Sequence, residues 1–227
     1  ETADEAVRAF DTAETVDAGR DALISALEEN AKTLVQTADL LKYKYQLKFG
    51  GIDFSLAPFP EETRSLGAAF ERMGVPSVGM HGSLAAAAIL AEALERAHFP
   101  RTGFCGLMMP VLEDAFLAER AAEGRLTIKD LLLYSAVCGT GIDTVPLPGD
   151  VTTGQIAALL LDVAALALRL DKPLTARLMP VPGKQAGDMT SFDFGYFSNS
   201  RVMALKAEPL KKVLAGVETF RLEKRGH

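Results

Sequence analysis

The 227-residue chain has no tryptophan, only two cysteines and no long basic segment. Two cysteines are too few for a disulfide framework in a chain of this length, which favours a reducing compartment and predicts a cytoplasmic protein. The formal net charge of −6 argues against nucleic-acid binding through a basic face, because the only Lys/Arg cluster is the final LEKRGH. These absences exclude a disulfide-rich secreted domain and a basic nucleic-acid-binding module.

The sequence also shows no signal-peptide pattern and no clear membrane segment. Its most apolar run, residues 156–170, contains Asp162 and Arg169 and is too short to cross a bilayer, so we expect a buried helix there. The chain starts with Glu1 rather than Met, and we therefore expect it to be part of a longer protein.

The length and the hydrophobic content of 48% favour one large domain, with two small ones as the alternative. Residues 1–18 are polar and acidic and predict either a loosely attached arm or a short amphipathic helix. Residues 19–227 are predicted to form a single α/β domain.

Apolar residues at three- and four-residue intervals predict a long helix from about residue 20, ending at Gly50-Gly51. Alternation of helices and strands beyond it predicts right-handed crossovers and a mostly parallel sheet. The predicted strands are 52–57, 104–109, 142–147 and 174–179. The other predicted helices are 61–73, 83–98, 113–124, 127–137, 152–170 and 208–224.

Each predicted strand is followed by a proline-bearing turn with polar residues: APFPEE, MPVLED, VPLPGD and MPVPGK. The carboxyl ends of parallel strands point the same way, and ligands bind at that edge. The sequence thus predicts that a set of polar residues meets there: Ser55, Glu113, Asp114, Asp143, Asp150, Lys184 and Asp188.

The stretch YSAVCGTGIDTVPLPGD, residues 134–150, joins the end of an apolar helix to a glycine turn, a strand and an acidic loop. Cys138 is either a nucleophile, which requires a lowered pKa, or a small buried hydrophobe. Thr140 follows it in the turn. Asp150 either contributes to a site or, with Thr152, caps the next helix.

Four carboxylates carry the chemistry that the residues suggest: Glu113, Asp114, Asp143 and Asp150. Such a cluster could bind Mg²⁺ or Ca²⁺, with Asp143 and Asp150 as ligands, or divide acid and base roles. Acidic residues at helix starts also occur for purely structural reasons. His81 is either an acid, base or substrate ligand, or a packing residue at a helix start.

Lys184 lies between Gly183 and the Gly187-Asp188 pair, in a turn that could hold a phosphate or a carboxylate. The turn is not a P-loop, and the sequence has no dinucleotide fingerprint and no Gly-x-Ser-x-Gly elbow. Residues 187–203, rich in aromatic and small polar residues, predict either a substrate lid or a hairpin that covers a sheet edge.

Four spaced motifs, SLAPFP, MPVLEDA, AVCGTGIDTVPLPGD and RLMPVPGKQAGD, resemble the domain-of-unknown-function 711 family over residues 19–203. The resemblance implies part of an α/β barrel related to the glycyl-radical enzymes such as pyruvate formate-lyase, in a cytoplasmic protein of unassigned activity. Family members are about twice as long, so the chain looks like a C-terminal half whose N-terminal half is absent or on another chain. The matched motif positions include Cys138, Asp143, Asp150, Lys184 and Asp188.

Two departures from the family pattern bear on chemistry. The segment 81–84, His-Gly-Ser-Leu, stands where a Gly-Thr-Thr-Ala type of helix start is expected. The C-terminal segment also lacks the glycine loop of the radical enzymes, so the resemblance implies no glycyl radical, and a shared fold alone does not establish a function.

The leading hypothesis is an enzyme that binds a small polar or anionic molecule at the strand carboxyl ends. Its rival is a non-catalytic ligand sensor, and a third reading is a homo-oligomerisation module built on the long helix. The predicted catalytic residues are Cys138, Asp143, Asp150 and Glu113, and the predicted substrate-binding residues are Ser55, His81, Thr140, Lys184 and Asp188.

Overall fold

The computed structural model describes residues 2–216 and 218–226. The N-terminal segment forms the short helix α1 (Ala3–Asp11), which buries Ala3, Ala6 and Phe10 against α2 and α3. Of the two alternatives for residues 1–18, the structure shows the helix. Its apolar residues recur at three- and four-residue spacing, which places them on the face that meets the core.

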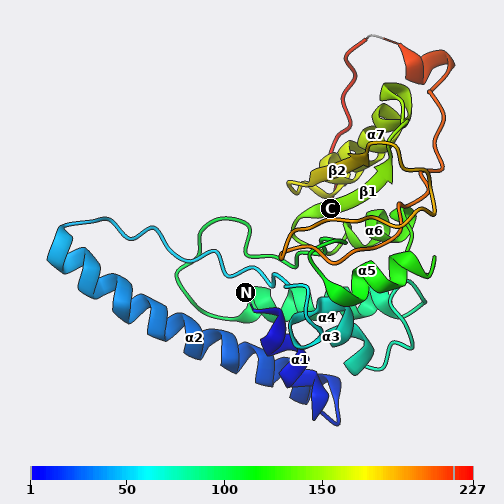
Figure 1. The fold of residues 1–227 in the computed structure, drawn as a ribbon. Helices are drawn as coiled ribbons and strands as arrows, with labels where there is room; N and C mark the ends of the chain where they lie inside the picture. The colour runs from blue at the N-terminus through cyan, green and yellow to red at the C-terminus, as the bar shows by residue number, and fades with distance from the viewer. Residues whose placement is uncertain (1, 217, 227) are drawn as a thin grey trace.

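Helix α2 (Val16–Tyr45) starts where the Thr15 hydroxyl accepts a hydrogen bond from the Ala18 N–H. It ends at Gln46, which adopts a left-handed conformation, four residues before the predicted Gly50-Gly51 stop. Figure 1 shows its N-terminal half packed on α1 and its C-terminal half extending away from the rest of the molecule. The burial follows this arrangement, because Leu23 and Leu27 are buried whereas Leu34, Leu41 and Tyr45 are about half exposed.

The helical part of the core is completed by four shorter helices. The predicted helix 61–73 is split into a 3-10 turn (Glu62–Arg64) and α3 (Leu66–Arg72), because Ser65 is extended and caps α3. The remaining helices are α4 (Ser83–Arg96), α5 (Ala115–Ala122) and α6 (Ile128–Tyr134).

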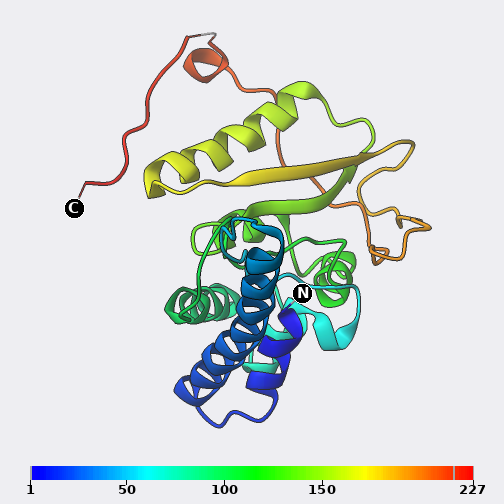
Figure 2. The ribbon, with the colours of Figure 1, turned by 90° about the vertical axis from the view of Figure 1, so that its left-hand side faces the viewer.

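The sheet consists of two parallel strands, β1 (Gly141–Pro148) and β2 (Thr175–Val181), joined through α7 (Thr153–Leu170). Figure 2 shows α7 on one side of the strands and the helical part of the molecule on the other. Strand β1 is buried along almost its whole length, whereas β2 alternates between exposed and half-buried residues. The α/β class is confirmed, but the residues that the structure describes form no barrel.

The predicted strands 52–57 and 104–109 are wrong. The two segments run side by side, but they meet only in isolated parallel bridges, Ile52 with Arg101 and Leu56 with Leu107. The positive φ angles of Gly103 and Cys105, 66° and 44°, break the extended backbone between the two bridges.

The structure contradicts the expectation that the apolar run 156–170 is buried, since only Leu159 and Val163 of α7 are buried. The sequence also predicts that this run is too short to cross a bilayer. At 18 residues and a mean hydropathy of 1.5, α7 is the one helix among the described residues whose length and composition would allow it. A single helix of this kind is weak evidence of a membrane segment.

The predicted helix 208–224 is wrong as well. The described part of this region contains one 3-10 turn (Lys212–Ala215) and is otherwise irregular. Pro209 disfavours a helical residue before it, and Val213 and Phe220 are exposed without an apolar surface to pack on.

Candidate functional site

Asp143 lies near the start of β1, beside an irregularity in the sheet. The register of β1 against β2 shifts between Ile142 and Val145, and Thr144 between them has a φ of 40°. A β-branched residue with positive φ is strained, and β-bulges are enriched beside active sites, where they redirect a side chain. The irregularity therefore makes Asp143 and the residues around it a candidate functional site.

The segment that precedes α5 runs beside β1, along the edge that is not paired with β2, and brings Glu113 close to Asp143. Pro110 forms a parallel bridge with Asp143, and the Val111 N–H donates to the Asp143 carbonyl at 3.0 Å. The Leu112 N–H donates to the Thr144 hydroxyl at 3.2 Å. The strained Thr144 thus fixes the chain immediately before Glu113.

Arg177, on β2, joins the two carboxylates. Its Nε donates to one oxygen of Asp143, and its Nη2 lies 2.9 Å from the other oxygen of Asp143 and 2.9 Å from Glu113 Oε1. The Asp143 side chain is 3% exposed, whereas Glu113 is 26% and Arg177 51% exposed. We call these three residues the carboxylate–arginine cluster.

The environment of the cluster changes the pKa values of Glu113 and Arg177. Burial raises the pKa of Glu113, and the charge of Asp143 adds to this, while Arg177 acts in the opposite direction. The hydrogen bonds to Asp143 raise the pKa of Arg177, so the guanidinium stays charged. Glu113 is therefore a carboxyl group that holds its proton more tightly than usual and is still reachable from solvent, which suits a proton donor.

A second polar group lies beyond the carboxyl end of the sheet. The Gln185 side chain donates to Asp150 at 3.1 Å, the Gln185 N–H donates to Asp188 at 2.7 Å, and the Gly149 N–H donates to the Lys184 carbonyl at 2.9 Å. The prediction that Asp143 belongs to this edge is wrong. Asp143 is the third residue of β1, and about five residues of strand at ~3.3 Å each, some 17 Å, separate it from Pro148.

Asp114 does not belong to either group. It is completely buried and accepts five hydrogen bonds: two from the start of its own helix α5, and three from the start of α3. Burial raises its pKa, and these hydrogen bonds act against that shift. The prediction that Asp114 joins the polar residues at the carboxyl edge of the sheet is therefore wrong, because Asp114 caps two helices.

The other predicted residues are placed as follows. Cys138 is buried with its thiol 3.8 Å from the Gly141 carbonyl, which favours the packing role over the nucleophile. Thr140 is also buried, and its hydroxyl lies 3.4 Å from the Leu107 carbonyl. The Ser55 hydroxyl donates to Asp53 at 2.7 Å, and Asp53 is not a member of the carboxylate–arginine cluster. His81 is exposed and lies just before the start of α4.

Metal binding by Asp143 and Asp150 stays a prediction. Within residues 2–216 and 218–226, no group of three or more His, Cys, Asp or Glu side chains is arranged to hold a metal ion. Both oxygens of Asp143 are already bonded to Arg177. A cation there would have to displace the guanidinium.

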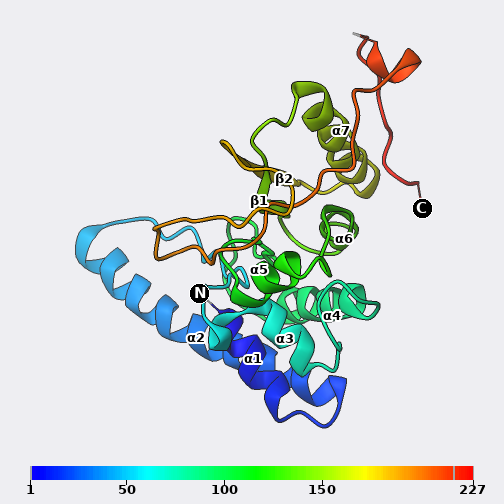
Figure 3. The ribbon, with the colours of Figure 1, turned by 45° about the vertical axis from the view of Figure 1, so that its right-hand side comes forward.

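The aromatic segment 187–203 forms a loop closed by an antiparallel bridge between Met189 and Arg201, as in the hairpin alternative. Its Ser198 N–H donates to the Leu112 carbonyl at 2.7 Å, directly before Glu113. Tyr196 packs edge-on against Phe59 at 5.6 Å and is more than half exposed. Figure 3 shows this loop reaching from the sheet toward the N-terminal part of the molecule.

Arg177 is the member of the carboxylate–arginine cluster that the sequence did not predict. It lies in the RLMP part of the motif RLMPVPGKQAGD. The residues predicted from that motif, Lys184 and Asp188, belong to its turn and not to its strand. The available signal was its position on a strand parallel to that of Asp143, because neighbouring parallel strands bring an arginine and an aspartate together when their registers match.

Comparison with known proteins gives one family. A family model described as Uncharacterised ACR (DUF711) matches residues 1–199. A UPF0210 protein of Pyrobaculum arsenaticum is 44% identical over 65% of the chain, and one of Lacticaseibacillus paracasei is 33% identical over 80%. These matches cover 33% and 44% of the two relatives, so the chain spans less than half of the length of either.

Proposed function

The chain belongs to the DUF711 family of uncharacterised proteins, and from this premise we propose that its carboxylate–arginine cluster is the acid–base site of an enzyme. The substrate is a small polar or anionic molecule. The observation that carries the proposal is the solvent-accessible Glu113 with a raised pKa, held against Arg177 beside a strained residue of β1.

The three side chains divide the work. Asp143 is a positioning residue, because its buried carboxylate fixes two nitrogens of Arg177. Among the hydrogen bonds of the described residues, none involves Arg177 Nη1, so this nitrogen is available to donate to a carbonyl or carboxylate of the substrate. Glu113, 2.9 Å from the same guanidinium, then donates or accepts the proton.

A panel of hydroxy acids, keto acids, amino acids and sugar phosphates tests this proposal by thermal shift, followed by NMR of the incubated compounds. A compound that raises the melting temperature of the wild-type chain is expected to do so no longer in Arg177→Lys. Arg125→Lys, at an exposed arginine that pairs with Glu123, is the control and keeps the shift. The proposal is wrong if the shift survives both Arg177→Lys and Glu113→Gln.

The same panel separates the enzyme from the ligand sensor. A sensor binds a compound through Arg177 and leaves it chemically unchanged, and Glu113→Gln then has little effect on binding. An enzyme converts the compound, and Glu113→Gln lowers turnover by about 10²-fold or more, the usual contribution of a general acid or base.

We also propose that α2 carries a self-association surface. One apolar stripe runs along the helix, and it is buried at Leu23, Leu27 and Ala31 but exposed at Leu34 and Leu41. The proposed occupant is a second copy. In such a pair, the exposed Leu34 and Leu41 of one copy pack against those of the other, because the N-terminal half of the stripe is already buried within its own chain.

The remaining parts of the proposal rest on the family resemblance. The exposed, half-paired strand β2 is compatible with a sheet that continues into a larger α/β barrel in a family-length protein. A cytoplasmic location and the absence of glycyl-radical chemistry are also proposed on the basis of the family resemblance.

A further inference from the structure

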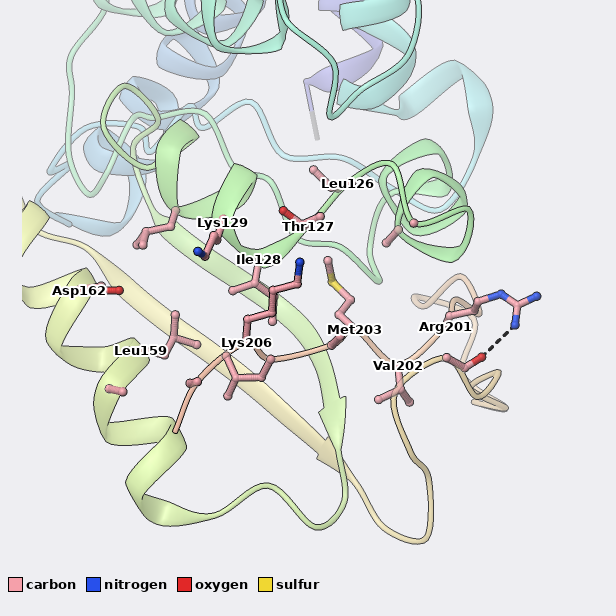
Figure 4. A pocket seen from close by; sticks show the side chains of 18 of the residues that line it. Leu126, Thr127, Ile128, Lys129, Leu159, Asp162, Arg201, Val202, Met203 and Lys206 are labelled. Carbon is pink, nitrogen blue, oxygen red and sulfur yellow. Dashed lines mark hydrogen bonds between the residues drawn. The ribbon is translucent and has the colours of Figure 1, made fainter. Parts of the chain in front are cut away.

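A cavity of about 660 Å³ lies in the C-terminal half of the chain, with a lining that is separate from the proposed acid–base site. It is bounded by the start of α6, by α7 and by the tail segment 201–210, and no member of the carboxylate–arginine cluster lines it. Figure 4 shows Ile128, Leu159 and Met203 from these three elements around it. Its volume falls within the ~300–1,000 Å³ typical of small-molecule sites.

The lining combines an apolar body with unpaired positive charge. Lys129 and Lys206 both line the cavity, and neither is among the ion-paired residues of the described chain. In Figure 4 the Lys206 side chain extends from the tail toward Thr127, between Ile128 and Met203. Both lysines are exposed to solvent, so their ammonium groups can bind an anionic head group while the apolar part of the same molecule lies in the cavity.

The lining carries three acidic residues, Glu123, Asp162 and Glu208, beside its three basic ones. Glu123 is paired with Arg120 and Arg125, which lie outside the lining. The Arg201 guanidinium donates to the Gly187 carbonyl at 2.9 Å, which leaves the two lysines as the ligands for an anion.

We propose that this cavity binds a small amphipathic anion, with an aliphatic or aromatic body against Ile128, Leu159 and Met203 and a carboxylate or phosphate at Lys129 and Lys206. The family match ends at residue 199, so the wall formed by 201–210 lies outside the matched region. The binding site is thus a feature of this chain in addition to the acid–base site.

Calorimetric titration of the 227-residue chain with four probes below their micellar concentrations tests the proposal. Decanoate and decyl phosphate are expected to bind, and comparing them identifies the preferred head group. Decyltrimethylammonium carries the same chain with a positive head, and butyrate carries the head with a short chain, so both are expected to bind at least about tenfold more weakly.

Two pairs of variants locate the site. Ala158→Trp fills the cavity and is expected to abolish decanoate binding, whereas Ala157→Trp, at the exposed neighbouring position outside the lining, leaves it unchanged. Lys206→Met is expected to weaken binding by about tenfold, and Lys211→Met, outside the lining, has no effect. Circular dichroism confirms that each variant is folded.

Three results would overturn the proposal. One is that neither anion binds to the folded wild-type chain. Another is that decyltrimethylammonium binds as tightly as decanoate, which would show that the charge of the lining has no role. The third is that decanoate binds equally to Ala158→Trp and to Ala157→Trp, which would place the ligand elsewhere.

Discussion

Replacing Asp114 by alanine is expected to destabilise the chain far more than the loss of an ordinary helix cap. Its carboxylate accepts hydrogen bonds from the Phe116 and Leu117 N–H groups, both at 3.0 Å, at the start of α5. It also accepts from the Ser65 hydroxyl at 2.5 Å and the Leu66 N–H at 2.6 Å, at the start of α3. One side chain therefore holds two helix N-termini together.

The magnitude follows from these contacts. Loss of the α5 cap costs about 1 kcal/mol. Ser65 and the Leu66 N–H are buried, and each donor left without an acceptor costs a further ~1–3 kcal/mol. Asp114→Ala should thus lower the free energy of unfolding by about 3–7 kcal/mol, and Asp114→Asn by less, because the amide oxygen still accepts at one helix start.

Urea denaturation followed by circular dichroism measures this difference, with Thr152→Ala as the matched control. Thr152 caps α7 through the Gln155 N–H at an exposed position, where water replaces the lost partner, so its removal costs about 1 kcal/mol. If Asp114→Ala lies within about 1 kcal/mol of Thr152→Ala, the carboxylate does not hold α3 and α5 together as inferred.

Three further predictions concern the site, the glycine turn and α2. Burial raises the pKa of Glu113 above its ordinary value of 4.5, so the stability gained from its protonation is present below that value and is lost as the pH rises through the folded-state pKa. Glu113→Gln should therefore be at least as stable as wild type at neutral pH and should lose this advantage in acid; a larger deficit at neutral pH than in acid, measured by urea denaturation, contradicts the assignment. Gly139→Ala should cost at least about 2 kcal/mol, because its Cβ would lie 2.4 Å from the Gly106 Cα, whereas Gly195→Ala, with open space around it, should stay within about 0.5 kcal/mol of wild type in the same assay. Leu41→Asp should abolish self-association in sedimentation velocity while Gln36→Asp, on another face of α2, preserves it; a wild-type chain that is monomeric at all concentrations would remove the proposed α2 pair.

The sequence predicted the helices well where their stability depends on local signals. The apolar spacing in α2 and the capping residues Thr127 and Thr152 are visible without a structure, and the structure confirms them. Composition predicts strands at 52–57 and 104–109, and this prediction is wrong because composition does not reveal whether a neighbouring segment can supply a continuous ladder.

Burial was predictable only as a periodic pattern. Spacing in α7 predicts one buried stripe, but only Leu159 and Val163 of it are buried, whereas Leu160 and Leu170 are more than two-fifths exposed. The predicted stripe consists of Ile156, Leu159, Leu160, Val163, Ala167 and Leu170. Composition states which residues are apolar, whereas the extent of the surface that covers them is a tertiary property.

The candidate site shows the same division between local and tertiary information. Glu113 and Asp114 are adjacent, and the sequence offers both as equivalent carboxylates before a helix. The chain turns there into α5, so that Asp114 points into the core and caps two helices while Glu113 stays at the surface beside Arg177. Full satisfaction by five donors commits Asp114 to structure, and partial burial beside a second carboxylate leaves Glu113 able to exchange a proton. The proposed chemistry at this site therefore depends on the contact between β1 and β2 that brings Arg177 to Glu113, and a change that moves Arg177 away should raise the pKa of Glu113 further, because the guanidinium opposes the effect of burial.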